Sequence, residues 1–482
     1  MATPELGKAA APNRFDLFRQ MFGVPLAILL TAVVWFMRTP AGLSPQGQKA
    51  LSLFVGIFVL YLTEAIPLAV SSVLVVPAAV LMGIAPVGPA LSGFASPSAY
   101  LILAAFILAA GMVKTKLAER ITYLILARTG SSPARITLGI TIANIVIAFL
   151  VPSGTARTAL LLPICMSIIS LFAAEGRSKF ATNLLLVMSF TNSTIAAGIL
   201  TATVPNPVVV EFLAKTGKTV TYTDWLIYGF PPALVMTFFT WWFIQKVFKP
   251  EAELTPGGAD RMIRERLQAL GKTTTAEWRM LAVFLLITVL WTTQNWTKLD
   301  ATVVCLLGDC LLFVPWFGVL TWSDANKEVS WQVLLIAGGG ISLGEMLMRT
   351  GAAKWLAGSI FKLLGLQGSS VLLIIIVVMF IVQYMHLFFS TVVAMATALL
   401  PIITAMAEAA HVNPVVLVLP AGMIIGGGPL LMFYNTLPNV VVYGSGKLRV
   451  EDFPKVGVPL CAFACILYAL TAATYWRWLG LF

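Results

Sequence analysis

Two short polar segments interrupt long apolar stretches of this sequence, and both carry groups that could bind an anion. Ser153-Gly154-Thr155 divides the apolar stretch 136–174, and Ser390-Thr391 divides the stretch 369–407. Hydroxyl groups can donate to a carboxylate or a sulfate, and their oxygens can also bind a cation. A helix that begins directly after such a segment adds backbone N–H donors, so its amino terminus is a ready anion site. The alternative is that the hydroxyls only cap buried helices.

A second pair of segments, Thr203-Val204-Pro205-Asn206 and Thr436-Leu437-Pro438-Asn439, places proline inside an apolar run. Proline removes a backbone donor and frees carbonyl groups of the preceding turn. Glycine weakens the helix nearby, with Gly198 in the first run and Gly426-Gly427-Gly428 in the second. We therefore expect two broken helices beside the polar segments. The alternative is a proline kink that is purely architectural.

Arg157 is the most informative single charge. An arginine near the centre of a bilayer costs roughly 2.5–3.5 kcal/mol even on insertion scales, and it tends to be functional. An anionic substrate would offset that cost, whereas the alternative is a side chain that reaches the cytoplasmic edge. Glu64, Asp309, Glu345 and His386 are the other ionisable residues in apolar stretches. Of these, Asp309 and His386 are candidates for proton coupling, and the two glutamates can simply lie at span ends.

The composition is that of a membrane protein. Of 482 residues, 59% are hydrophobic and 11% are charged, with a mean hydropathy of +0.92, whereas soluble proteins have about 25% charged residues. A water-soluble multidomain enzyme is therefore excluded. The excess of 31 basic over 20 acidic residues is typical of basic cytoplasmic loops and predicts no nucleic-acid partner. Two histidines and five cysteines without metal-site spacing predict no resident metal or haem.

Apolar runs long enough to cross the bilayer recur along the whole chain. They predict an all-α polytopic membrane protein with about eleven transmembrane helices, each crossing about 30 Å of hydrocarbon. The stretches 136–174 and 369–407 are predicted to be re-entrant hairpins, because a non-helical tip at membrane depth must face protein or water. The predicted spans are 21–37, 48–62, 67–83, 98–113, 181–204, 223–245, 280–294, 301–320, 330–347, 414–437 and 456–476.

The chain divides into two similar halves. The charged segment 246–279 is predicted to be a cytoplasmic linker between the halves 1–245 and 280–482. The two Thr-x-Pro-Asn segments are corresponding positions of an internal repeat. With the amino terminus in the cytoplasm, most basic residues fall on the cytoplasmic side, as the positive-inside rule requires. The halves then have inverted topology, which together with broken helices is typical of secondary transporters.

These motifs, with Thr63-Glu64-Ala65-Ile66-Pro67 and Tyr443-Gly444-Ser445-Gly446, resemble the divalent anion:sodium symporter (DASS) family of dicarboxylate, tricarboxylate and sulfate carriers. The similarity runs over nearly the whole chain in the right order. It implies scaffold and transport domains, an elevator movement of the transport domains, and a homodimer held by the scaffold domains. We expect a multi-pass protein of the cell (inner) membrane. An intramembrane enzyme is disfavoured, because no Ser/His or Asp/Asp arrangement is matched across spans.

The hairpin motifs bear on the coupling ion. In sodium-coupled members of the family each tip reads Ser-Asn-Thr and helps to enclose Na⁺. Here Gly154 replaces the first asparagine, none occurs around Ser390-Thr391, and each Thr-Pro-Pro-Asn motif has lost one proline. Thr155-Ala156-Arg157 is similar instead to the exchanger branch, which includes citrate/succinate and tartrate/succinate antiporters and plastid 2-oxoglutarate/malate translocators. A guanidinium can compensate a dianion and pair bidentately with a carboxylate.

We therefore expect a secondary active transporter that exchanges small di- or tricarboxylates, or similar divalent anions, without sodium or with protons. The alternative is a sodium-coupled symporter of the same fold for sulfate or dicarboxylate. No cofactor besides such a coupling ion is expected. The predicted substrate site comprises the two tips, the two breaks and one arginine: Ser153, Gly154, Thr155, Arg157, Thr203, Pro205, Asn206, Ser390, Thr391, Thr436, Pro438 and Asn439. If sodium is used, its predicted ligands are Ser153, Ala202, Thr391 and Asn435.

Overall fold

A computed structural model describes residues 14–172, 178–250, 258–428 and 431–481, and within these ranges all regular structure is helical. The helices up to the charged segment are α1 (Arg14–Phe36), α2 (Pro45–Thr63), α3 (Leu68–Leu81), α4 (Val87–Ala90), the 3₁₀ helix η1 (Ser92–Ala95), α5 (Pro97–Lys114), α6 (Leu117–Thr129), α7 (Pro133–Leu150), α8 (Gly154–Phe172), α9 (Lys179–Ala196), α10 (Pro205–Lys215) and α11 (Tyr222–Val247).

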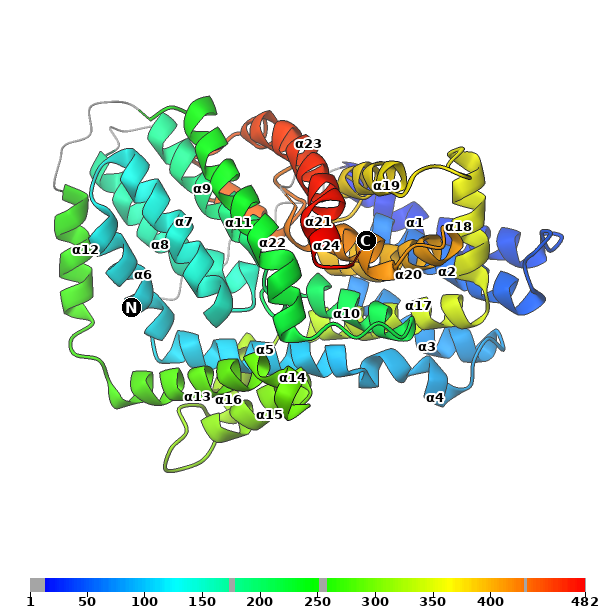
Figure 1. The fold of residues 1–482 in the computed structure, drawn as a ribbon, viewed down its shortest axis with the longest axis horizontal. Helices are drawn as coiled ribbons and strands as arrows, with labels where there is room; N and C mark the ends of the chain where they lie inside the picture. The colour runs from blue at the N-terminus through cyan, green and yellow to red at the C-terminus, as the bar shows by residue number, and fades with distance from the viewer. Residues whose placement is uncertain (1–13, 173–177, 251–257, 429–430, 482) are drawn as a thin grey trace.

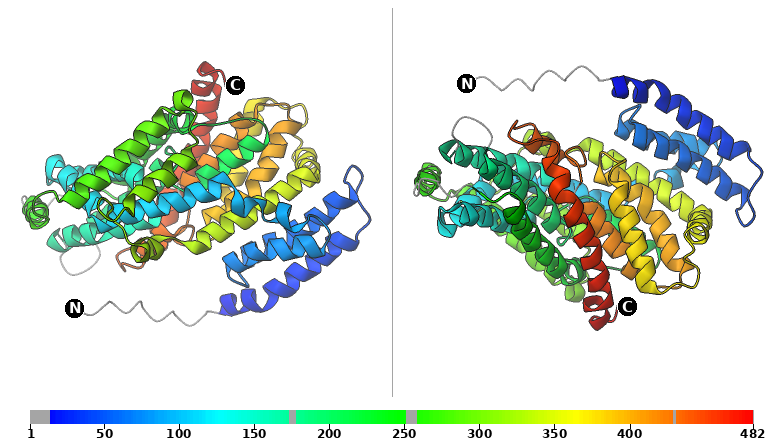
Figure 2. Two further views of the ribbon diagram at one scale, coloured as in Figure 1. Left: turned by 90° about the horizontal axis from the view of Figure 1, so that it is seen from below. Right: turned by 90° about the horizontal axis from the view of Figure 1, so that it is seen from above.

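The remaining helices run from the charged segment to the carboxyl end. They are α12 (Gly258–Ala269), α13 (Thr275–Thr292), α14 (Gln294–Thr297), α15 (Ala301–Leu312), α16 (Trp322–Glu328), α17 (Trp331–Arg349), α18 (Ala352–Leu363), α19 (Val371–Met385), α20 (Val392–Ala409), α21 (Pro414–Gly427), α22 (Leu437–Tyr443), α23 (Asp452–Ala473) and α24 (Tyr475–Trp478). In Figure 1, α6 to α9 and α12 lie at one end of the long axis, and α1 to α4 and α18 lie at the other. In Figure 2, α1 and α2 lie along one flank of the molecule, and α3 joins them to α17, where Gly339 packs against Ser72.

The structure confirms the all-α membrane fold. Among the described residues, eight helices are long and apolar enough to cross a bilayer, and five shorter apolar helices accompany them. The number of eleven spans stays a prediction. The predicted span 301–320 is shorter than expected, because α15 ends at Leu312 and an irregular segment follows.

Both interrupted apolar stretches form pairs of helices. Residues 151–153 separate α7 from α8, and residues 386–391 separate α19 from α20. Pro152 has no N–H to continue α7. On the other side of the break, Ser153 Oγ accepts a hydrogen bond from the backbone N–H of Ala156 at 3.3 Å, as a helix cap does. Thr391 caps α20 in the same way, accepting from Ala394 N–H at 3.3 Å.

The two proline-containing runs are broken as expected, and the breaks lie against each other. The first run separates into α9 and α10, and the second separates into α21 and α22. A Cβ added to Gly427 would lie 2.6 Å from Ala197 Cβ, and one on Gly426 would lie 2.9 Å from Thr203 Cγ2. Real Cβ atoms do not approach so closely, so these glycines are required where the two broken helices cross.

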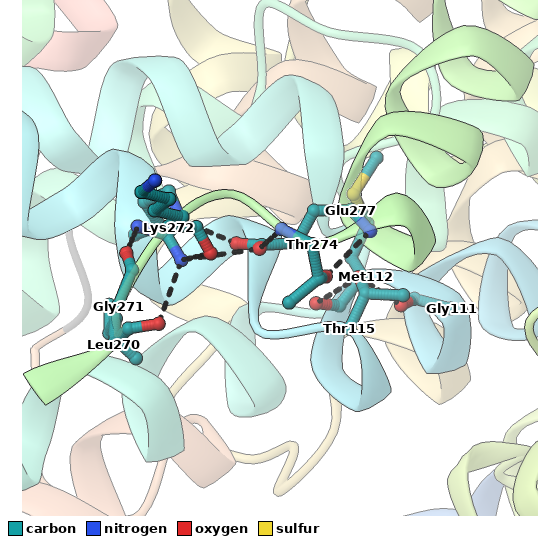
Figure 3. A network of polar contacts seen from close by, with 9 residues as sticks. Gly111, Met112, Thr115, Leu270, Gly271, Lys272, Thr274 and Glu277 are labelled. Atoms are coloured by element: carbon teal, nitrogen blue, oxygen red, sulfur yellow. Dashed lines mark hydrogen bonds and ion pairs between the residues drawn. The ribbon is translucent and has the colours of Figure 1, made fainter.

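The predicted linker 246–279 contains regular structure that the sequence did not indicate. It includes α12, whose Ala259 and Ile263 are buried, and the first turn of α13. Arg120 of α6 fixes the connection between them, because it forms a bidentate pair with Glu277 (2.5 and 3.2 Å). It also donates to the carbonyls of Gly271 at 2.9 Å and Leu270 at 3.1 Å. Figure 3 shows this network from close by.

We expect the Arg120 network to hold this segment against α6 and, through α6, against the first hairpin. Arg120→Gln leaves the buried Glu277 carboxylate without its cation, which costs about 3 kcal/mol for a buried pair. The thermal unfolding midpoint of the purified protein should fall clearly. Arg261→Gln is the matched control, because it breaks a solvent-exposed pair with Glu265 and should leave the midpoint unchanged. Equal midpoints for both variants would contradict this role of Arg120.

Candidate functional site

A cavity of about 140 Å³ lies where the two hairpin tips meet the two helix breaks. Its walls also include apolar side chains of α5 and α17, Phe106 and Val333. Nine of the twelve residues predicted for the substrate site line this cavity: Ser153, Gly154, Thr155, Arg157, Thr203, Ser390, Thr391, Thr436 and Pro438. Segments more than 280 residues apart in sequence therefore converge on one cavity that is rich in hydroxyl groups.

The other three predicted residues lie behind the cavity. Pro205 is the first residue of α10. Asn206 is buried and donates to the carbonyls of Ala196 at 2.9 Å and Ile199 at 2.8 Å, so it holds the end of α9 against the start of α10. Asn439 is buried as well, where it accepts from Ser189 Oγ and donates to the Met432 carbonyl. Both asparagines bridge helical segments at the breaks, and their role in substrate binding stays a prediction.

Of the helices that begin at this cavity, α8 and α20 each follow one of the two tips. At the start of α8, the backbone N–H groups of Gly154 and Thr155 have no hydrogen-bond partner among the described residues. At the start of α20, the same holds for the N–H groups of Val392 and Val393. Each helix amino terminus carries the equivalent of about half a positive charge. The cavity thus has unpaired donors and positive potential from two directions.

Arg157 adds a full positive charge to the same place. Its side chain is completely buried, so it does not reach the cytoplasmic edge. Nη1 donates to the carbonyls of Val151 at 2.7 Å and Ala202 at 3.1 Å. Nε and Nη2 donate to the side-chain and backbone oxygens of Asn192 at 2.6 and 3.2 Å. Every one of these acceptors is neutral, and within the described ranges no carboxylate pairs with Arg157.

This geometry changes the expected contact between Arg157 and a substrate. Four of its five N–H donors are used by the protein, so a bidentate pair with a carboxylate is not available in this conformation. The guanidinium instead ties the first tip to the first break and carries its charge directly behind the tip. Within a medium of low dielectric constant that charge acts on the cavity over several ångströms.

Asn192 of α9 belongs to the site and was missed from the sequence. Besides accepting from Arg157, its Nδ2 donates to the Gly154 carbonyl and to Thr158 Oγ1, both at 2.8 Å. It therefore fixes both the guanidinium and the first turn of α8. The only signal in the sequence is an amide inside the polar stretch Thr191-Asn192-Ser193-Thr194, and that signal does not identify a partner.

The residues proposed as sodium ligands already have partners within the protein. The Ala202 carbonyl accepts from Arg157, and the Thr391 hydroxyl accepts from Ala394 N–H. Asn435 accepts from the Met432 N–H and donates to the His386 carbonyl. The fourth, Ser153, caps α8. In the first half, the Ala202 carbonyl, which the sodium alternative would use, thus accepts from a guanidinium.

The other ionisable candidates lie away from the cavity lining. His386 is buried, with its ring nitrogens 3.1 Å from the Gln383 carbonyl and 3.3 Å from the Ile425 carbonyl. Asp309 is buried in α15. Glu345 of α17 pairs with Arg349 and Lys215, and Glu64 ends α2 in a left-handed conformation.

A family model described as the sodium:sulfate symporter transmembrane region matches residues 19–482. The chain belongs to the DASS family. It is therefore a membrane transporter, as predicted, and not an enzyme. The similarity covers both hairpins, both breaks and the cavity between them, so the site lies within the shared region.

Relatives of known name support this assignment. The sodium-dependent dicarboxylate transporter SdcS of Staphylococcus saprophyticus is 31% identical over 469 residues, which cover 91% of this chain and 88% of the relative. SdcS of Staphylococcus aureus is 28% identical over 476 residues, covering 94% and 90%. A membrane protein of Cupriavidus necator is 30% identical over 478 residues, covering 95% and 93%.

Two solved structures share the fold at low sequence identity. MtrF of Neisseria gonorrhoeae, from a class of antimetabolite efflux pumps, has a TM-score of 0.56 at 12% identity and covers 95% of this chain and 94% of that one. The YdaH transporter of Alcanivorax borkumensis has a TM-score of 0.50 at 12% identity and covers 97% and 98%. Both are transporters, and the likeness extends to the fold alone.

Substitutions of Asn192 test whether the cavity depends on an uncompensated positive charge. Asn192→Ala removes two hydrogen bonds to α8 and one to Arg157, and we expect succinate affinity to fall about tenfold, for about 1.4 kcal/mol. Asn192→Asp removes the same amide donors but adds a carboxylate beside the guanidinium, and it should abolish binding. Equilibrium binding of labelled succinate to the purified variants measures both. If the aspartate variant binds as well as the alanine variant, the charge of Arg157 has no role.

Proposed function

We propose that this protein is a secondary active transporter that exchanges small di- or tricarboxylates across the membrane without sodium. The proposal rests on one observation: the buried guanidinium of Arg157 has no carboxylate partner among the described residues. It lies behind a cavity that is lined by hydroxyls and two helix amino termini. A buried charge is costly unless an opposite charge compensates it. A divalent anion in the cavity supplies that opposite charge.

The positive charges at the two tips and at Arg157 suit a dianion. Two helix amino termini count for about half a charge each, and the guanidinium of Arg157 adds one, so the sum is about +2. The amino termini of α8 and α20 come from opposite halves of the chain, and each offers two free backbone N–H groups. We propose that one carboxylate lies at each terminus, with the hydroxyls of Ser153, Thr155 and Ser390 as further donors.

The contacts of Arg157 support independence from sodium. In a sodium-coupled carrier the cation offsets the charge of the substrate, and backbone carbonyls at the tip and break are suitable ligands for it. Here Val151 and Ala202 present such carbonyls, and both accept from Nη1 of Arg157. A sodium ion at these oxygens would lie in contact with a guanidinium, which like charges disfavour. Because the charge of Arg157 stays in the site, the empty carrier would have to cross the membrane with an uncompensated cation. The carrier therefore returns with a second anion bound, and the result is exchange.

We base the proposed movement and assembly on the resemblance to the DASS family. We propose an elevator movement of the two hairpins and the two broken helices against a scaffold, within a homodimer in the cell (inner) membrane. The amino terminus would lie in the cytoplasm, with 246–279 as the linker between the inverted halves 1–245 and 280–482. Helix α17 packs closely on both α3 and α20: a Cβ on Gly339 would meet Ser72 O at 2.2 Å, and one on Gly340 would meet Thr397 Cβ at 2.2 Å.

A sodium-coupled dicarboxylate symporter is the second candidate. The named relatives SdcS are sodium-dependent dicarboxylate transporters. The second tip is compatible with a sodium site. Among the described residues that line the cavity, no cation equivalent to Arg157 lies at that tip.

Transport assays in proteoliposomes separate the two candidates. We expect uptake of labelled succinate that requires unlabelled dicarboxylate inside and does not change when external Na⁺ is replaced by choline. Uptake into empty vesicles driven by a Na⁺ gradient would establish the symporter instead. If neither succinate nor citrate nor sulfate is taken up under either condition, the proposed substrate class is wrong.

Arg157→Gln tests the charge directly. Glutamine keeps hydrogen-bonding groups but removes the positive charge, so dianion exchange should fall below detection. Arg157→Lys keeps the charge without the fork that holds Val151, Ala202 and Asn192, and we expect exchange at a reduced rate. Thermal midpoints of both variants show whether they fold. Exchange at the wild-type rate by the folded glutamine variant would show that Arg157 is only structural.

A further inference from the structure

An apolar groove of about 480 Å³ lies between α1 and α3 and over α2, and it shares no lining residue with the substrate cavity. The floor is α2, and α1 approaches it so closely that a Cβ on Gly56 would lie 2.2 Å from Thr31 Oγ1. The walls carry side chains such as Ile28, Phe36 and Leu81, of which Phe36 is 82% and Leu81 is 86% exposed. Figure 2 shows α1 and α2 on the flank of the molecule.

One end of the groove carries positive charge. The Lys49 ammonium lies 5.3 Å from the centre of the Trp35 ring, which lines the groove. Arg38 follows two residues after Phe36, beyond the end of α1, and is exposed. Neither cation pairs with a carboxylate in the ranges that the structure describes. Tryptophan at a helix end is typical of the membrane–water interface, which indicates that this end of the groove lies at the depth of lipid headgroups.

We propose that the groove is a binding site for one anionic phospholipid. An acyl chain fills the apolar groove between α1 and α3, and the headgroup phosphate lies between Lys49 and Arg38. The two unpaired cations favour a lipid with net negative charge over a zwitterionic one, whose ammonium group they repel. The inference does not depend on which anion the carrier transports.

The charges also argue against a second copy of the chain as the occupant. A twofold contact is self-complementary and presents the same patch from both subunits. Such a contact centred on this groove would bring Lys49 and Arg38 of both copies toward one another, and like charges at an interface are unfavourable. A phospholipid can cover the apolar groove with its acyl chain and pair its phosphate with the two cations.

Native mass spectrometry of the full-length protein tests the proposal. The delipidated protein is titrated with phosphatidylglycerol or phosphatidylcholine of the same acyl chains. We expect one phosphatidylglycerol to bind at least tenfold more tightly than phosphatidylcholine. Lys49→Gln combined with Arg38→Gln should remove this preference. Lys354→Gln combined with Lys362→Gln is the matched control, because it removes two cations of α18 outside the groove, and it should keep the preference.

A second variant tests the groove itself. Ala32→Trp places a large side chain within the wall formed by α1, and it should lower binding of both lipids while the cations remain. The proposal is overturned if the two lipids bind equally to the wild type, or if the Lys49 and Arg38 variant keeps its preference. It is also overturned if Ile28→Cys cross-links two chains efficiently in membranes, because the groove is then an interface between copies.

Discussion

The organisation of this transporter depends on one buried charge. Arg157 is completely buried and makes four hydrogen bonds, all of them to neutral oxygens of the first hairpin, the first break and Asn192. Such a cation is stable only where the surrounding backbone is irregular enough to offer free carbonyls. The broken helices satisfy that need, and we propose that the remaining uncompensated positive charge attracts anions to the cavity.

The glycines and prolines make this arrangement possible. Pro152 and Pro205 interrupt helices where carbonyl groups must turn toward the guanidinium, and the Gly426–Gly428 segment lets the second broken helix cross the first without a steric clash. The same breaks start α8 and α20, whose amino termini face the cavity. The two halves therefore contribute differently to the cavity. Both supply a helix amino terminus, but in the lining that the structure describes only the first half supplies a buried guanidinium.

Much of this architecture was predictable from residue type and spacing. Hydroxyl residues between two apolar runs predicted both tips, and proline together with glycine predicted both breaks. Such residues are rare in the middle of apolar runs unless the helix is interrupted there. The contacts of Arg157 were not predictable, because backbone carbonyl partners cannot be identified from side-chain types. Asn192 was missed for the same reason. Asn206 and Asn439 were predicted for the substrate site, and the structure places them behind the lining, where they bridge the breaks. Helix α12 was hidden in a segment whose charge indicated only a linker.

The central claim is that Arg157 supplies the positive charge that a sodium ion supplies in sodium-coupled relatives. Isothermal titration of succinate into the purified protein tests it most directly, in NaCl and in choline chloride at equal ionic strength. The account predicts the same dissociation constant in both salts. Binding that appears only in NaCl would contradict it, because the guanidinium would then be insufficient to hold a dianion in the cavity.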